Sequence, residues 1–212
     1  MAQTSEEWSQ RAVALPVEFR RYHEIGGALM FAAFDNAEGD IGSALSAIGN
    51  MIPGTKVDRL RALGARSISD KTFFGDWYDS ASGDLLRLGS ITTADGRSLV
   101  NPRLRDLEGV AISNAAIALP EIGAGGQFAY AFSWTPYGLN AKRGEVQNLF
   151  SAIREFVLPA GREHQILDWS NPKLTDVSQY FEAGMEWWGV FLFTVYTPSN
   201  RRLTVIAGST TD

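Results

Sequence analysis

The most apolar run of the chain reads EWWGVFLFTVY and extends from Glu186 to Tyr196. It is too short for a membrane-spanning helix, which needs about 20 apolar residues, and its β-branched and aromatic residues favour a strand. Both sets of alternate positions are apolar, so we expect a central strand that is covered on both faces. The alternation places Trp188 with Val190 and Leu192 on one face and Trp187 on the other.

A short turn and a second strand follow this run. The turn signal is TPSN at Thr197–Asn200, in which proline presets the backbone and asparagine tolerates a left-handed conformation. The next residues, Arg202–Ala207, alternate largely between polar and apolar. We therefore expect an antiparallel hairpin in the C-terminal region.

The N-terminal third carries mainly helical signals. A capping-box pattern predicts a first helix over Thr4–Leu15, which Pro16 ends. Asp40 can cap a second helix, and Thr55 with Asp58 can cap a third. We expect the second and third helices to pack against each other as a helical hairpin.

Residues 17–34 fit two different structures. Two apolar-rich segments flank the dipeptide Gly26–Gly27. They predict either a β-hairpin that turns on the glycines or a single helix that the glycines weaken. We favour the hairpin slightly over the helix.

Strand signals dominate the second part of the chain. The dipeptide Asp95–Gly96 between two apolar segments is a strong hairpin signal. Residues 109–119 and 127–135 flank a glycine-rich stretch and are expected to form a further antiparallel pair. Shorter strands are predicted at residues 164–169 and 177–182.

The clearest helix spans Lys142–Leu158, where apolar residues recur at the spacing of one helix face. Together the elements predict an α+β fold: a mostly antiparallel β-sheet with one long amphipathic helix packed on it and a helical N-terminal third. We expect a single domain over residues 1–212. A soft subdivision into residues 1–70 and 71–212 remains open, although no linker marks it.

Composition narrows the classes of function. The chain is 45% hydrophobic and 20% charged, as is usual for a globular domain. A net charge of -5 argues against a nucleic-acid partner, which needs a basic surface. The absence of cysteine excludes disulfides and thiolate chemistry, and no secretory signal is visible, so we expect a soluble, cytoplasmic protein without a membrane partner.

No motif for a cofactor or metal is present. The stretch from Gly123 to Gly126 is followed by Gln127 and Phe128 and not by the lysine and hydroxyl residue of a phosphate-binding loop. No two histidines stand at ligand spacing. We therefore expect no cofactor and no metal site.

The main functional candidates are large aromatic residues near loops: Trp77, Trp134, Tyr137 and Trp169. Such residues can stack on a ligand or anchor a protein partner, and they can equally roof the core. Our first hypothesis is a non-catalytic binding protein that recognises a protein partner or a small ligand through these aromatic residues.

Two alternatives remain open. Whether the protein is an enzyme is uncertain, but His164 or His23 could belong to a hydrolase or transferase site that is assembled from distant residues. On a strand His164 and Asp168 lie about 13 Å apart, so they do not form a local pair. The third hypothesis is a structural subunit of a homo-oligomer.

Overall fold

The computed structural model describes residues 11–121, 127–186 and 188–210. Its main element is a six-stranded sheet in which every pairing is antiparallel. In their order across the sheet, the strands are β1 (Arg11–Val13), β2 (Leu29–Asp35), β11 (Arg202–Ser209), β10 (Val190–Thr197), β9 (Gln165–Asp168) and β3 (Arg66–Ile68). The expected α+β class with a mostly antiparallel sheet is confirmed.

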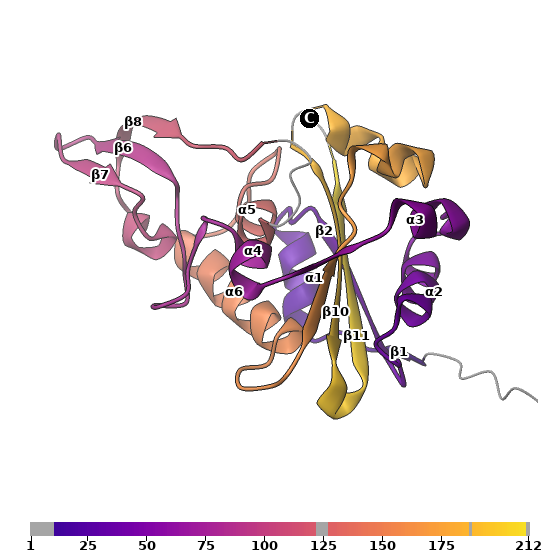
Figure 1. Ribbon diagram of the computed structural model, residues 1–212. Coiled ribbons are helices and arrows are strands. Elements are labelled where there is room, and N and C mark those ends of the chain that lie inside the picture. Colours follow the sequence, from indigo (N-terminus) through magenta and orange to yellow (C-terminus); the bar gives the residue numbers. More distant parts are fainter. Residues whose placement is uncertain (1–10, 122–126, 187, 211–212) are drawn as a thin grey trace, which may run out of the picture.

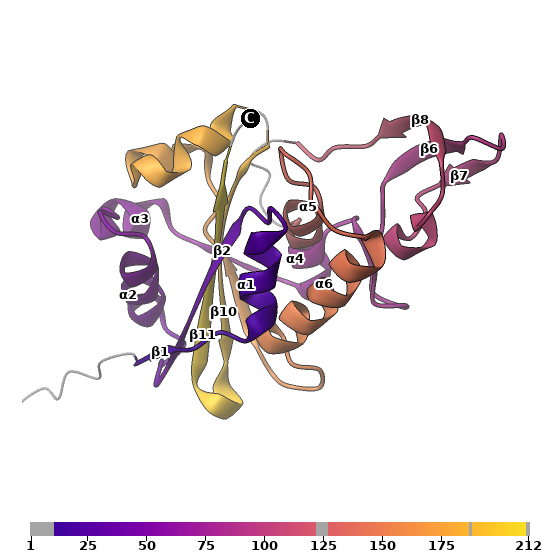
Figure 2. The same ribbon diagram turned by 180° about the vertical axis from the view of Figure 1, so that it is seen from behind.

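Helices cover both faces of this sheet, as Figure 1 and the reverse view in Figure 2 show. The helices of one face are α1 (Val17–Glu24), α4 (Asp70–Phe74), α5 (Phe128–Ser133) and α6 (Arg143–Val157). Those of the other face are α2 (Ile41–Met51), α3 (Val57–Leu63) and the 3-10 helices η2 (Pro172–Asp176), η3 (Gln179–Phe181) and η4 (Ala183–Met185). The sheet therefore separates two hydrophobic cores.

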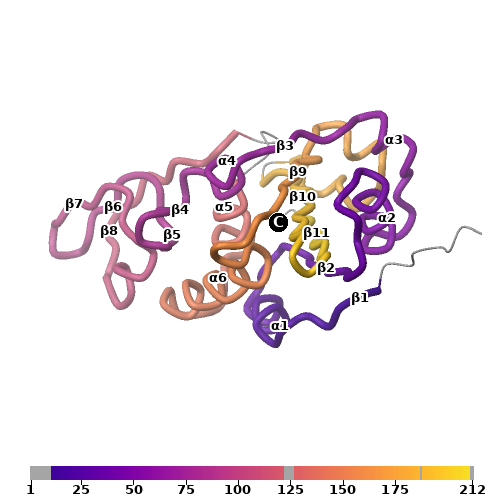
Figure 3. Tube along the Cα trace, turned by 60° about the horizontal axis from the view of Figure 1, so that its bottom comes forward, coloured from indigo at the N-terminus to yellow at the C-terminus, as the bar shows by residue number. Residues whose placement is uncertain are grey.

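Between α4 and α5 the chain leaves this body and builds a projecting part (Figures 1 and 3). Its elements are β4 (Tyr78–Asp79), β5 (Asp84–Leu85), β6 (Gly89–Thr93), β7 (Ser98–Val100), the 3-10 helix η1 (Leu104–Leu107) and β8 (Ile112–Ile117). Strands β7, β6 and β8 form a three-stranded antiparallel sheet in that order. We call this sheet the arm.

Strand β10 occupies the central position that its sequence predicts. It pairs with β9 on one side and with β11 on the other. Phe191 and Phe193 enter the core under α1, α4, α5 and α6, whereas Val190 and Leu192 enter the core under α2 and α3. The continuous apolar run thus reflects burial on both faces.

The predicted face of Trp188 is wrong. Trp188 lies in the same core as Phe191, and their ring centroids are 4.9 Å apart. Gly189, with a φ of 116°, lies just before β10, which begins at Val190. The alternation of side chains between the two faces of the sheet therefore does not extend back from β10 to Trp188. Trp187 lies outside the described residues.

Several local predictions are confirmed. Helix α6 matches the amphipathic segment predicted at Lys142–Leu158, and Asp40 caps α2 by accepting from the Ser43 N–H at 2.6 Å. The turn at Asp95–Gly96 connects β6 and β7, with Gly96 at a φ of 86°. The C-terminal hairpin is β10 and β11, whose turn contains the short helix η5 (Pro198–Asn200).

Other predictions are wrong, and the N-terminal third is helical only in part. Residues 17–34 form a helix and then a strand, α1 and β2, instead of a hairpin or one helix. Residues 11–13, predicted as helix, form β1; the start of that helix lies outside the described residues. Thr55 does not cap α3 but donates its hydroxyl hydrogen to the Ile52 carbonyl at 2.6 Å.

Two predicted strands are helices. Residues 127–135 contain α5, all six residues of which are buried, and residues 177–182 contain the 3-10 helix η3. A helix that is buried on every side lacks polar positions, so its sequence shows no helical period. In the part of the chain that the structure describes, no helix is both long and apolar enough to cross a membrane.

The double burial of β10 predicts a large cost for truncating its side chains. Phe193 is fully buried and stacks edge-on against Phe73 of α4 at 5.2 Å. We expect Phe193→Ala to lower the free energy of unfolding by about 3–5 kcal/mol, measured by urea denaturation. Val100→Ala, at a side chain that is 73% exposed, serves as a control with an effect within about 0.5 kcal/mol. A similar small loss for Phe193→Ala would contradict this account of the core.

Candidate functional site

Three of the four aromatic residues predicted to bind a ligand come together where the arm meets the helices. Trp77 lies shortly after α4 and Trp134 directly after α5, and their ring centroids are 5.8 Å apart. Tyr137 follows closely and is 77% exposed. Trp169 lies elsewhere: it is buried in the core under α2, and its indole N–H donates to Thr194 Oγ1 at 3.0 Å.

An arginine that the sequence reading overlooked lies against both tryptophans. The guanidinium carbon of Arg87 is 4.3 Å from the ring centroid of Trp134 and 5.5 Å from that of Trp77. The Arg87 N–H donates to the Pro102 carbonyl at 2.8 Å, and the Trp134 carbonyl accepts from the Trp188 indole at 2.5 Å. These two hydrogen bonds fix the main chain of Arg87 and Trp134, and the side chains then place the cation over the electron-rich ring faces.

This group of residues contains buried polar atoms without hydrogen-bond partners. Among the described residues four such side-chain atoms occur: Trp77 Nε1, Arg87 Nη1, Thr135 Oγ1 and Gln127 Oε1. Buried polar groups are nearly always paired, and an unpaired one costs about 1–3 kcal/mol. The first three atoms belong to Arg87, its stacking partner and the residue after Trp134, and all three can donate. None of the three has an acceptor of the described residues within hydrogen-bond distance.

The charge around Arg87 is mainly positive. Within residues 11–121, 127–186 and 188–210, no carboxylate forms an ion pair with it, whereas Lys142 and Arg143 line the same cleft. Burial lowers the pKa of Arg87 to about 10, and the charge of Arg143 adds to the shift, so Arg87 stays charged at neutral pH. The carboxylate of Glu108, at the same cleft, already accepts from the Gly144 N–H at 3.0 Å.

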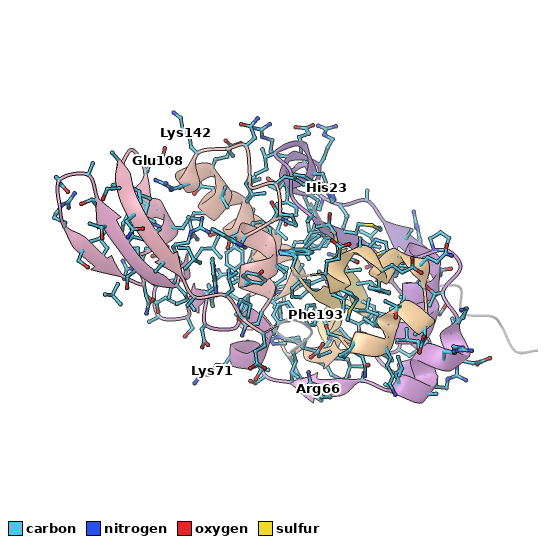
Figure 4. The ribbon with its side chains drawn as sticks, turned by 90° about the horizontal axis from the view of Figure 1, so that it is seen from above. His23, Arg66, Lys71, Glu108, Lys142 and Phe193 are labelled. Atoms are coloured by element: carbon cyan, nitrogen blue, oxygen red, sulfur yellow. The ribbon has the colours of Figure 1, made fainter. Side chains whose placement is uncertain are left out.

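Arg87 forms part of the wall of a cleft of about 600 Å³. Trp134, Thr135 and Tyr137 also line it, and Trp77 packs behind the guanidinium with 1% of its surface exposed. Lys142 and Glu108, which also line this cleft, are labelled in Figure 4. We call this the Arg87 cleft. Its size is that of a small-molecule site.

A second cleft, of about 730 Å³, lies on the opposite side of the molecule, where Figure 4 labels Lys71. His164 lines it, and its Nε2 is 2.7 Å from Asp70 Oδ1. Its Nδ1 faces the Arg162 carbonyl at 3.1 Å. Both partners are acceptors, so each ring nitrogen faces a protein oxygen, although a neutral imidazole can donate to only one of them.

His23 and the acidic loops are weaker candidates for a functional site than the two clefts. His23 is exposed on α1 and rests beside Tyr22, with ring centroids 5.8 Å apart. Two acidic loops, residues 35–40 and 76–84, hold carboxylates with structural partners, because Asp40 caps α2 and Asp84 pairs with Arg105. In the described part of the chain, no three His, Asp or Glu side chains gather as metal ligands.

The sequence contained one signal for Arg87 that was not used. Arg87 stands inside the apolar stretch Leu85–Leu88. An arginine within a short apolar run has few ways to reach water, and this is the signal that could have marked it.

Comparison with models of known protein families, with curated proteins and with solved structures yields no match. The chemistry of the Arg87 cleft is therefore inferred from its geometry.

The unpaired Arg87 predicts an unusual stability effect. Replacing it by methionine removes the buried Nη1 atom that has no hydrogen-bond partner, worth about 1–3 kcal/mol, and loses a cation–π contact worth about 0.5–2 kcal/mol. We expect Arg87→Met to leave the thermal stability of the ligand-free protein unchanged or to raise it, as measured by calorimetry. A loss of more than about 2 kcal/mol would instead make Arg87 a structural residue.

Proposed function

We propose that the protein is a non-catalytic binding protein that holds a small anionic ligand in the Arg87 cleft. The observation that carries the proposal is a partly buried guanidinium, that of Arg87, which stands in the wall of the cleft beside Lys142 and Arg143 and has no carboxylate partner among the described residues. A site of this kind is incomplete without an acceptor that carries negative charge.

The chemistry of the donors favours an oxyanion. The planar guanidinium can bind two oxygens of a carboxylate or a phosphate at once. A water molecule can accept from Arg87 and Thr135, which line the cleft, but it brings no charge to offset that of the guanidinium. Lys142 and Arg143 at the same cleft would attract the anion toward Arg87 in a protein whose overall charge is -5.

The aromatic residues define the other half of the ligand. Trp134 and Tyr137 line the cleft next to the charged groups, and the exposed ring of Tyr137 offers a face for stacking. A flat or apolar group attached to the oxyanion would fit there. This favours a small organic acid or phosphate ester over a protein partner, because the surface is concave and limited in size.

A hydrolase at His164 is less well supported. The pair His164–Asp70 does lie in a cleft at 2.7 Å, which such a site requires. A general base, however, needs a ring nitrogen that can take a proton from the substrate, and both nitrogens of His164 face protein acceptors. We therefore prefer binding to catalysis.

The proposal is tested by anion-dependent stabilisation. Inorganic phosphate and benzoate are titrated at constant ionic strength against chloride, with calorimetry and tryptophan fluorescence as readouts. A ligand that binds only the folded state adds about 2.7 kcal/mol of stability when its concentration is about 100 times Kd. We expect such stabilisation, with a change in fluorescence because Trp77 and Trp134 contact Arg87.

Variants locate the effect. We expect Arg87→Met to abolish the stabilisation and Arg87→Lys to weaken it, because lysine keeps the charge but lacks the planar fork. Arg162→Gln, at an arginine of the opposite cleft, is the matched control and should bind like the wild type. Equal stabilisation of the wild type and Arg87→Met, or none in either, would contradict the proposal.

A further inference from the structure

The outer edge of β8 is unlike the other free edges of the two larger sheets. In the described residues those other edges are β1, β3 and β7, each only three residues long, and β1 and β3 each include an arginine. Strand β8 has six residues, Ile112–Ile117. Natural proteins keep free edges short, charged, bulged or covered, because an unpaired edge recruits other strands.

Strand β8 lacks most of these protections. From Val110 to Leu119 the sequence VAISNAAIAL has no charged residue and no proline. Every residue of β8 is exposed except Ile117, which is half-buried. Ser113 forms the single irregularity, where its hydroxyl donates to the Thr92 and Thr93 carbonyls at 3.0 and 3.1 Å. The rest of the strand pairs with β6 in a regular register.

The hydrogen bonds of β8 to β6 show which backbone groups stay free. The Ala118 N–H donates to the Leu88 carbonyl at 3.1 Å. Because alternate residues of an antiparallel strand face the same neighbour, Ala116 and Asn114 also turn toward β6. Ala115 and Ile117 therefore direct their N–H and C=O groups outward, where no strand of the described residues lies.

We infer that β8 pairs with β8 of a second copy of this chain, antiparallel about a two-fold axis. The pairing would join two arms into one sheet in the order β7-β6-β8-β8-β6-β7. Strand β8 is suited to this pairing because it contributes no charge and has the small residues Ala115 and Ala116 in its middle. Two copies can therefore meet without charge repulsion or steric conflict. The arm projects from the body, which leaves its edge open to another molecule (Figures 1 and 3).

The two-fold axis restricts the register. Outward-facing residues of the two strands must oppose each other, so the registers that pair most of β8 place the axis at Asn114 or Ala115. In both registers Ala115 lies opposite or diagonally next to its own copy. A charge at Ala115, whose side chain is exposed in one chain, is therefore brought close to the same charge in the other chain.

The test is the molar mass in solution, measured by light scattering and sedimentation across a wide range of concentration. We expect the wild type to approach twice the 23.2 kDa of one chain. Ala115→Lys and Ala115→Asp should each weaken the dimer at least tenfold, and an equal mixture of the two variants should restore it, because opposite charges then face each other. Circular dichroism of each variant checks that it is folded.

Proline variants give an independent control. Ala115→Pro removes an outward N–H without touching the bonds to β6, so it should abolish the dimer. Val100→Pro is the matched change on the opposite edge of the arm. The Asn101 N–H donates to the Gly89 carbonyl of β6, so the N–H of its neighbour Val100 faces outward. This variant should therefore leave the dimer intact. A mass of one chain at every concentration overturns the inference, as does a dimer that the Ala115 variants leave unchanged.

Discussion

The fold depends on the burial of β10 on both of its faces. A strand whose alternate residues are all apolar cannot leave either side of the sheet in water. Two helical layers are therefore required, and the chain supplies them from separate regions: α2, α3 and the 3-10 helices for one face, and α1, α4, α5 and α6 for the other. The remaining strands extend the sheet on either side of β10 and β11.

The layer formed by α1, α4, α5 and α6 is held together by contacts between phenylalanine rings. Phe73 of α4 contacts Phe193 of the sheet at 5.2 Å and stacks on Phe128 of α5 at 4.8 Å. Phe128 in turn lies 5.8 Å from Phe150 of α6. These contacts connect the sheet to its outermost helix, and they fix the ends of α4 and α5 from which Trp77 and Trp134 project. The packing of the core thus determines where the Arg87 cleft forms.

The Arg87 cleft and the edge of β8 have different physical characters. The cleft combines unmet hydrogen-bond donors with uncompensated positive charge, which selects an anion. The edge combines unmet backbone groups with a lack of charge, which selects another strand. Both lie in or beside the segment between α4 and α5, the part of the chain that contributes least to the central sheet.

Local sequence patterns were reliable where one interaction dominates. The amphipathic period of α6, the Asp–Gly turn of the arm and the Asp40 cap each depend on residues a few positions apart, so the sequence contains the whole cause. Prediction failed where burial removed the pattern, as in α5, whose residues are all buried, and where a single glycine changed the phase, as at Gly189 before β10.

The sequence by itself determined the α+β class, the central strand and the recurrence of large aromatic residues near loops. It could not determine which of those residues meet. Trp77, Arg87, Trp134 and Lys142 come from separate elements, and only the packing of α4, α5 and α6 against one sheet brings them together. Whether a polar atom finds a partner also depends on every neighbour in space. The unpaired donors around Arg87, and with them the candidate site, are therefore a property of the tertiary structure alone.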